Sequence, residues 1–310
     1  MIKRTLYFGN PTYLSLSNSQ MMIRLPEVEK NAEIPEHIKS DSKRSLPIED
    51  LGVVILDHQQ ITITQALMDA LLGNNVALIT CNETHHPTGL LLPLAGNTLQ
   101  SERFRDQIDA SQPLKKNLWQ QTVQMKIKNQ ASVLRRMGVA VDNMMHWSSS
   151  VRSGDPDNFE ARAAAYYWKN IFPSELEFFR ERDGLPPNNL LNYGYAILRA
   201  IVARGLVASG LLPTLGIHHR SKYNAYCLAD DIMEPYRPFV DQVVKDIVYS
   251  GAPYVELDKT LKQQLLGIPV MDVWIEGERS PLMVGLQRTT SSLVKCFSGE
   301  SRKILYPEFQ

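Results

Sequence analysis

The hydrophobic pattern of this 310-residue chain changes once along its length, and that change limits the folds the chain can adopt. Near the N-terminus, strand-forming side chains cluster in short runs at residues 5–8, 13–16, 21–25 and 53–56. From residue 101 onward, apolar side chains recur every three or four residues, as they do along one face of a helix. We therefore predict an α+β protein, in which a small N-terminal β-rich domain precedes a larger all-α domain.

The segment between these two regions has neither period. Residues 83–97 contain two prolines, two glycines and an adjacent histidine pair that lacks nearby carboxylate partners other than one glutamate. These prolines and glycines predict a linker at residues 83–100, with a β-rich domain at 1–82 before it and a helical domain at 101–310 after it. The polar residues 27–43 are expected to form a long loop between strands. Helices are expected over residues 64–72, 101–109, 114–137, 159–171, 190–205, 238–249 and 257–266.

Composition excludes several classes of protein. The cysteines Cys81, Cys227 and Cys296 are too few and too scattered for a disulfide framework or a zinc cluster. The first residues lack the apolar core of a signal peptide, and no apolar run reaches the roughly 18 residues of a membrane span. We expect a soluble protein of the reduced cytoplasm that has no membrane partner.

The charges balance in number, 33 basic against 33 acidic residues, but they are unevenly placed. Residues 110–141 and 184–229 contain no acidic residue. The basic residues in them are Lys115, Lys116, Lys126, Lys128, Arg135, Arg136, Arg199, Arg204, Arg220 and Lys222. Local lysine and arginine attract phosphate, so these segments can present a basic face to a polyanion. The alternative is a solvated surface that acids from elsewhere compensate.

The second acid-free segment ends at a group of candidate metal ligands. His218 and His219 are followed by Asp230, Asp231 and Glu234. Asp231 and Glu234 are three residues apart, so on a helix they project from one face. Imidazole and carboxylate groups suit a divalent ion such as Mg²⁺ or Mn²⁺. The same pattern also fits a polar, solvated connection before an acidic helix start.

A third carboxylate of interest begins an earlier helix. Glu160 lies three residues after Asp157, which is the spacing of a capping box, so helix-end stabilisation alone could explain it. The alanines that follow it make a slim helix that permits close packing around Glu160. Both interpretations remain open from the local sequence.

Taken together, these stretches resemble CRISPR-associated protein 1, the family of integrases that insert new spacers, and the resemblance covers essentially the whole chain. The residues that carry it are Glu160 with the small and aromatic residues after it, PPNNLLNYGYAIL at 186–198, His219 three residues after Gly216, and DIMEPYRP at 231–238. Many members of the family have aspartate where Glu234 stands. Members from type II systems are similar to this chain at that position.

The resemblance implies a metal-dependent endonuclease and integrase that joins the 3′-hydroxyl ends of an incoming DNA to a CRISPR repeat by transesterification. It implies that Glu160, His219 and Glu234 bind Mg²⁺ or Mn²⁺ and are catalytic, with Asp231 either orienting a ligand or replacing one. Whether His219 is a ligand or a proton shuttle stays open. His218 is expected to contact DNA or pack locally. The DNA-binding candidates are Arg220, Lys222, Arg237, Lys126, Arg135 and Arg136.

The resemblance also implies partners: a homodimer of the chain, a dimer of CRISPR-associated protein 2, and the effector nuclease of a type II system. The sequence is compared with two alternative functions by what each requires. A non-catalytic DNA-binding scaffold has no need of an intact ligand set. A metal-dependent phosphohydrolase usually carries a His-Asp dipeptide, which the chain lacks.

Overall fold

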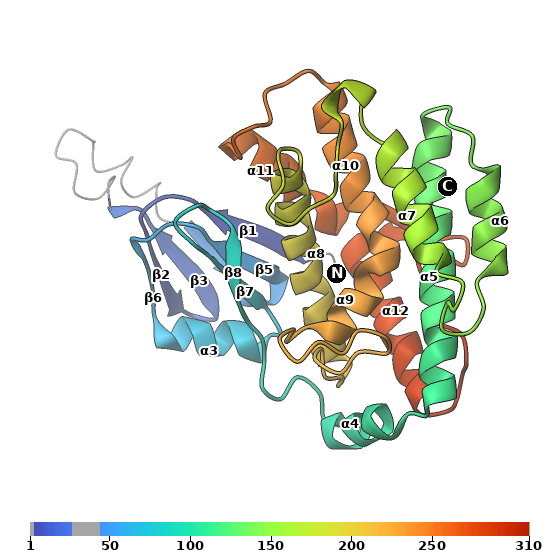
Figure 1. Ribbon diagram of the computed structural model, residues 1–310. Coiled ribbons are helices and arrows are strands. Elements are labelled where there is room, and N and C mark those ends of the chain that lie inside the picture. The colour runs from blue at the N-terminus through green and yellow to red at the C-terminus, as the bar shows by residue number, and fades with distance from the viewer. Residues whose placement is uncertain (1–2, 27–43, 310) are drawn as a thin grey trace. The chain divides into compact units, whose positions relative to one another are not determined.

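The computed structural model describes residues 3–26 and 44–309, and the chain divides into two compact units at residues 1–96 and 97–310 (Figure 1). The loop predicted at residues 27–43 lies outside the described residues. The division matches the predicted order of a strand-rich part followed by a helical part. The protein is mixed α and β, as the sequence predicts.

The N-terminal unit contains two four-stranded sheets and one helix. The first sheet has the order β1 (Arg4–Phe8), β5 (Leu51–Leu56), β7 (Ala77–Cys81), β8 (Pro87–Leu91). The second has the order β4 (Arg44–Pro47), β3 (Gln20–Arg24), β2 (Thr12–Ser17), β6 (Ile61–Ile63). The N-terminal unit also contains the helix α3 (Gln65–Gly73) and the 3₁₀ turn η1 (Ile48–Asp50). Their buried apolar side chains form one core, which includes Leu14, Met21, Leu51, Leu67 and Leu71.

The predicted linker at residues 83–100 is wrong in its first half, because this part forms strand β8. β8 pairs antiparallel with β7 at the edge of the first sheet. Pro87 begins this edge strand, where a missing amide costs no internal hydrogen bond. At Gly89, an added Cβ would collide with the Thr80 hydroxyl, so the glycine serves close strand packing. The preceding turn brings His85 Nδ1 within 2.8 Å of Asp57 Oδ1, a carboxylate partner that the sequence analysis did not foresee.

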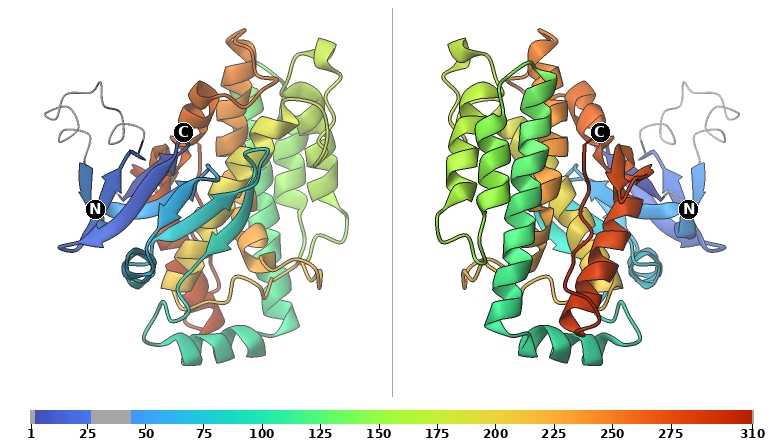
Figure 2. Two further views of the ribbon diagram at one scale, coloured as in Figure 1. Left: turned by 90° about the vertical axis from the view of Figure 1, so that its left-hand side faces the viewer. Right: turned by 90° about the vertical axis from the view of Figure 1, so that its right-hand side faces the viewer.

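The helical unit consists of nine α-helices with short connecting elements among its described residues (Figures 1 and 2). The helices are α4 (Gln100–Asp109), α5 (Gln112–Arg136), α6 (Asp142–Ser150), α7 (Phe159–Asn170), α8 (Asn188–Ala208), α9 (Cys227–Met233), α10 (Arg237–Tyr249), α11 (Lys259–Leu265) and α12 (Leu282–Phe297), where α11 spans only seven residues. Three 3₁₀ turns, η2 (Ser174–Leu176), η3 (Glu234–Tyr236) and η4 (Ile268–Val270), join them.

α5 is the long helix along which the unit is built. Its 25 residues span about 37 Å, and Ser111 caps its first turn by accepting a hydrogen bond from the Leu114 amide. α5 contacts α6, α7, α9, α10 and η3, as Figures 1 and 2 show for α6 and α7. Elements from three separate stretches of sequence therefore meet along one helix.

α8 is the core helix of the unit. It is long and apolar enough to cross a membrane by length and composition, but 78% of the apolar window is buried inside the protein. It packs against α10 and α12. At Gly194, an added Cβ would lie 2.5 Å from Val240 Cγ1, so the glycine lets α8 and α10 approach closely.

One hairpin interrupts the region predicted to be all-α. β9 (Asp272–Ile275) and β10 (Glu278–Pro281) pair antiparallel across a two-residue turn. Both turn residues, Glu276 and Gly277, have positive φ, as a type I′ hairpin turn requires. Each strand is too short to show a clear period of two, so the sequence pattern does not predict the hairpin.

Candidate functional site

Side chains from α5, α7, the loop before α9, and η3 come together at one place in the helical unit. Glu160 lies in the first turn of α7, and Glu234 begins η3. Both elements contact α5, which supplies Lys126. His219 lies in the loop between α8 and α9, and Asp231 lies in α9. The resemblance named Glu160, His219 and Glu234 together, and the fold brings all three segments to α5.

The two predicted carboxylates share one cationic group. Lys126 Nζ lies 2.6 Å from Glu160 Oε1 and 2.6 Å from Glu234 Oε2. Arg237 Nε donates a hydrogen bond of 2.8 Å to the other oxygen of Glu234. The contact at Glu234 Oε2 has the distance of an ion pair without the angles of a hydrogen bond, so this buried oxygen retains acceptor capacity.

The protonation of this group follows from its partners. Burial alone would raise the pKa of Glu234, but the positive charges of Arg237 and Lys126 outweigh burial and lower the pKa to about 2. Burial opposes the charged form of Lys126, but Glu234 and Glu160 raise its pKa above the ordinary value. At neutral pH the carboxylate of Glu234 is therefore ionised and Lys126 is protonated.

Glu160 is free to face Lys126 because a different residue caps its helix. The capping-box prediction is wrong: Asp155, rather than Asp157, accepts hydrogen bonds of 3.0 Å from the amides of Phe159 and Glu160. Asp157 instead forms an exposed ion pair with a neighbouring arginine. The left-handed conformation of Asn158, with φ of 55°, accompanies this change of partner.

His219 is held by a fully buried carboxylate. His219 Nδ1 lies 2.5 Å from Asp231 Oδ1, and Asp231 is completely buried while the imidazole is 45% exposed. Asp231 also accepts hydrogen bonds from the amides of His218, at 2.9 Å, and His219, at 3.2 Å. The hydrogen bond to Asp231 raises the pKa of His219. Because Nδ1 is engaged, Nε2 is the ring nitrogen available for chemistry.

Gly216 makes this arrangement sterically possible. An added Cβ there would lie 2.7 Å from Asp231 Oδ2 and would collide with the carbonyl oxygen of His219. His218 packs locally: its ring stacks on Trp119 with centroids 4.0 Å apart and planes 5° apart, and burial lowers its pKa. Both histidines of the loop are exposed; the His218 ring is stacked on Trp119, and the His219 ring is held by Asp231.

The predicted metal ligands do not form a three-ligand cluster in this structure. Within residues 3–26 and 44–309, no group of three or more His, Cys, Asp or Glu side chains is close enough to hold a metal ion. Glu160 and Glu234 meet at Lys126, while His219 faces Asp231. The ligand set and the use of Mg²⁺ or Mn²⁺ therefore stay predictions.

The structure divides the DNA-binding candidates into three groups. Lys126 and Arg237 are largely buried in ion pairs with Glu160 and Glu234. Arg220 and Lys222 are exposed in the loop that follows His219. Arg135 and Arg136 are exposed at the end of α5, nine and ten residues beyond Lys126, or about 14 Å along the helix.

A buried network behind Glu234 was missed by the sequence analysis. Asp241, 1% exposed, accepts hydrogen bonds from the hydroxyls of Tyr195 and, at 3.0 Å, Tyr167. The guanidinium of Arg237 lies 4.5 Å from the centroid of the Tyr195 ring. Burial outweighs these hydrogen bonds and raises the pKa of Asp241 to about 7. The NYGYA phrase contains Tyr195, but nothing in the sequence links it to Asp241.

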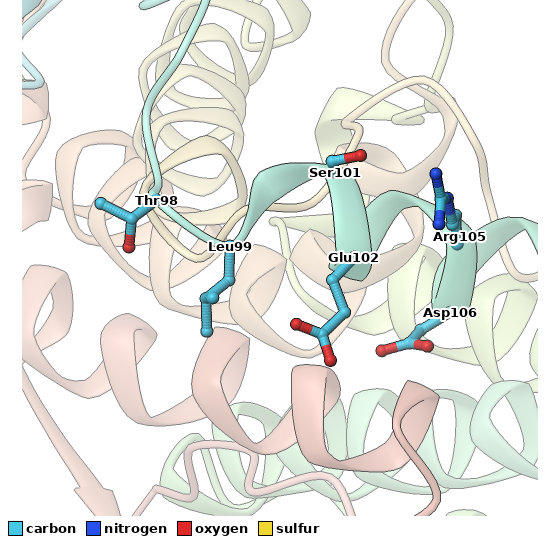
Figure 3. A pocket seen from close by; sticks show the side chains of 6 residues that line it. All are labelled: Thr98, Leu99, Ser101, Glu102, Arg105 and Asp106. Carbon is cyan, nitrogen blue, oxygen red and sulfur yellow. The ribbon is translucent and has the colours of Figure 1, made fainter.

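A pocket adjoins the candidate site, and another lies along α4. One, of about 170 Å³, adjoins Glu234 and is lined by Lys126, Gln130, Trp168, Arg180, Tyr195, Glu234, Arg237 and Asp241. The other, of about 360 Å³, follows α4, where Figure 3 shows Glu102 and Asp106 on one side of the helix and Arg105 apart from them. The second pocket contains none of the predicted site residues.

Comparison with known proteins identifies relatives of this chain. A family model described as CRISPR associated protein Cas1 matches residues 8–253. A protein of Neisseria meningitidis serogroup C, named CRISPR-associated endonuclease Cas1, is 37% identical over 294 residues, which cover 94% of this chain and 91% of the relative. The CRISPR-associated endonuclease Cas1 2 of Pyrobaculum aerophilum is 26% identical over 221 residues, which cover 67% of this chain and 74% of that protein.

Solved structures share the fold. A casposase bound to integration product has a TM-score of 0.77 at 18% identity and covers 98% of this chain and 92% of its own. A Cas1 protein of Thermotoga maritima has a TM-score of 0.72 at 14% identity, with 96% and 97% covered. At these identities the likeness concerns the fold alone.

Proposed function

Because the chain belongs to the family of CRISPR-associated protein Cas1, we propose that it is a metal-dependent DNA integrase and endonuclease of spacer acquisition. In the proposed reaction, the 3′-hydroxyl of an incoming DNA attacks a phosphodiester at the edge of a CRISPR repeat. A new P–O bond forms, the bond to the repeat's own 3′-oxygen breaks, and the proton of the attacking hydroxyl ends on the leaving oxygen. The observation that carries the proposal is the meeting of Glu160 and Glu234 at one cation position.

Two features of these residues support the proposal of a divalent ion. An ammonium already bridges the two carboxylates, and Glu234 Oε2 is buried and lacks a hydrogen bond. A histidine that binds a metal commonly donates its other ring N–H to a carboxylate, as His219 can to Asp231. We therefore propose that Glu160, His219 and Glu234 hold Mg²⁺ or Mn²⁺ once Lys126 has moved away, with Asp231 orienting His219.

A divalent ion, when bound, would polarise the phosphate and stabilise charge on the leaving oxygen. The other contributions come from the chain. Glu234 supplies an ionised carboxylate because its pKa lies near 2. Asp231 fixes His219 so that Nε2 faces away from the buried carboxylate, where it serves as a ligand or as a proton carrier. Arg220 and Lys222 follow His219 in the same loop and are exposed, and we propose that they contact phosphate oxygens.

The partners follow from the same premise. Solved structures that share this fold are described as a Cas6-RT-Cas1–Cas2 complex, with a TM-score of 0.73, and a TtCas1–DNA complex, with a TM-score of 0.51. We propose that this chain likewise acts on DNA as a homodimer beside a Cas2 dimer, in the cytoplasm, and with the effector nuclease of a type II system.

Strand joining tests the function. A duplex with free 3′-hydroxyl ends, a supercoiled plasmid carrying a repeat, Cas2 and Mn²⁺ or Mg²⁺ are incubated with the chain or with its Glu234→Gln or His219→Ala variant. We expect metal-dependent joining by the unaltered chain and a loss of at least a hundredfold in both variants, since each removes a proposed ligand.

The matched control is Glu102→Gln, a glutamate in the pocket along α4, which should join normally. Joining that survives both site substitutions would contradict the site assignment. Tight DNA binding without joining, in the unaltered chain supplied with all components, would favour the scaffold alternative.

A further inference from the structure

The helix α4 buries one side chain, and that side chain is polar. Of its ten residues Gln107 alone is buried, at 1% exposed, while Ile108 beside it is 56% exposed. α4 lies across one end of the helical unit (Figures 1 and 2). A surface helix ordinarily buries its apolar side chains and exposes its amides. The inversion at α4 indicates that the Gln107 amide is buried for the sake of its hydrogen-bond partners.

Both polar atoms of Gln107 face the segment that follows α8. Nε2 donates to the carbonyl oxygens of Leu212, at 2.9 Å, and Leu215, at 3.0 Å. Oε1 accepts from the backbone amide of Leu212 at 2.8 Å. These partners fix the orientation of the side chain, because the reversed amide would set oxygen against oxygen. One side chain of α4 therefore holds both ends of residues 212–215.

Residues 212–215 lead directly to His219. Gly216 comes next, and an added Cβ there would lie 2.7 Å from Asp231 Oδ2. Asp231 accepts two backbone amides of the loop, including that of His219 at 3.2 Å, and it contacts the His219 ring at Nδ1. The segment 212–219 is therefore held at its two ends, by Gln107 and by Asp231.

The hydrogen bonds inside this segment connect it to α9. The carbonyl oxygen of Pro213 accepts the backbone amides of Leu228, at 2.8 Å, and Ala229, at 3.2 Å. Bonds of this kind allow the loop and α9 to shift together. Gln107 belongs to a different helix, 105 positions before Leu212, so it ties the N-terminal end of the loop to α4.

We propose that Gln107 is a positioning residue for strand joining, which sets the place of the His219 imidazole through the backbone of residues 212–215; this rests on the proposed function. Loss of the Gln107 amide leaves two carbonyls and one backbone amide of the loop without their partner. The loop then rearranges to satisfy these groups, and His219 moves with it. A displacement of about 1 Å at a reacting group can slow a reaction roughly a hundredfold.

Gln107→Met tests the proposal, because methionine has a similar length and no amide. Strand joining is measured with all partners at increasing DNA concentration, which separates the rate at saturation from the half-saturating concentration. We expect the saturating rate to fall by about ten- to a hundredfold. The half-saturating concentration should stay within about twofold. Arg220, a proposed phosphate contact, is held separately by a hydrogen bond of 2.6 Å to Gln112 on α5, so DNA binding is retained.

The matched control is Arg103→Met, four residues earlier on α4. Arg103 donates to the carbonyl oxygen of Ser209 at 2.8 Å, so it ties the same helix to the end of α8 and not to residues 212–215. This variant should have a lower thermal midpoint and a saturating rate within about twofold of the unaltered chain. Gln107→Asn, a milder variant, keeps the amide one methylene short of its partners and should also lower the saturating rate.

Hydrogen exchange in a chelator tests the geometry without catalysis. In Gln107→Met, the backbone amides of His218 and His219 should exchange about tenfold faster than in the unaltered chain, because the loop has lost one of its two holds. Amides in the middle of α5 should exchange at the unaltered rate. In Arg103→Met the two loop amides should keep their rate as well.

Saturating rates of both Gln107 variants equal to that of the unaltered chain would overturn the proposal. So would a loss that lies wholly in the half-saturating concentration, or an equal loss of rate in Arg103→Met, because α4 would then act only by general attachment. The result is separable from the proposed function. Joining by the unaltered chain with unchanged loop exchange in Gln107→Met refutes the positioning role alone, whereas faster exchange without any joining by the unaltered chain refutes integration and leaves Gln107 as the anchor of the loop.

Discussion

Replacing Lys126 with methionine removes the ammonium between Glu160 and Glu234 while keeping a side chain of similar length. Lys126 is 12% exposed and lies 2.6 Å from both carboxylates, so the substitution leaves two negative groups facing each other. Breaking a buried ion pair in this way typically costs about 3 to 5 kcal/mol. Glu234 keeps Arg237, and the Glu160 side chain is 25% exposed to water, so the lower end, about 3 kcal/mol, applies.

Loss of the Lys126 ammonium should also strengthen the binding of a divalent ion by the two carboxylates. At a free Mn²⁺ concentration about 100 times the dissociation constant, binding stabilises the folded state by about 2.7 kcal/mol, which nearly offsets the loss. In the unaltered chain Lys126 competes with the ion, so Mn²⁺ should stabilise it less. The Lys126→Met variant should therefore gain more stability from Mn²⁺ than the unaltered chain does.

Thermal unfolding of the helical unit, with chelator and then with Mn²⁺, measures both effects. For a unit of this size, about 3 kcal/mol corresponds to a fall of roughly 9 °C in the midpoint. The matched control is Lys128→Met, an exposed lysine two residues along the same helix, which should change the midpoint little in either condition. A Lys126→Met variant as stable as the unaltered chain in chelator, or no more responsive to Mn²⁺, would refute the reasoning.

Three further substitutions follow from the geometry. Asp231→Asn should lower the pKa of His219, because the hydrogen bond to Asp231 raises it; a nuclear magnetic resonance titration that finds the pKa unchanged would contradict the arrangement. The raised pKa of Asp241, about 7 against an ordinary 3.8, contributes stability that is present at low pH and is lost as pH rises toward 7. Urea unfolding should therefore show the unaltered chain losing about 2 kcal/mol relative to Asp241→Asn between pH 5 and 7, a window above the titration of Glu234; parallel curves would contradict the shift. Gly216→Ala should destabilise the protein by about 1 to 3 kcal/mol and impair strand joining, because its Cβ would strike Asp231 and His219; normal joining at an unchanged thermal midpoint would contradict this.

The parts of the fold that were predicted are those in which local pattern and burial agree. Strand β5 is a continuous apolar run, five of whose six residues are buried, and α5 carries its apolar residues at helical spacing and begins at a capping serine. The edge strand β8 and the hairpin of β9 and β10 were missed, because proline, glycine and polar residues interrupt both. Helix α6 was missed as well, since it has only nine residues and two of them buried.

The sequence predicted some residues of the candidate site and assigned others to a different role. The motifs named Glu160, His219 and Glu234, and the fold brings their segments together. Lys126 was assigned to a DNA-binding surface because it stands in an acid-free stretch. Its partners lie 34 and 108 positions away along the chain, so no local pattern relates them.

The sequence by itself determined the order of a strand-rich part and a helical part, and it named the histidine and carboxylates of the candidate site. These follow from periodicity and from motif residues that stand close together along the chain. The tertiary structure decided which charges meet: Lys126 between two glutamates, Asp231 under His219, and Asp155 rather than Asp157 at the start of α7. Such pairings depend on burial and on distances of a few ångströms between groups, and both arise only when remote segments pack together.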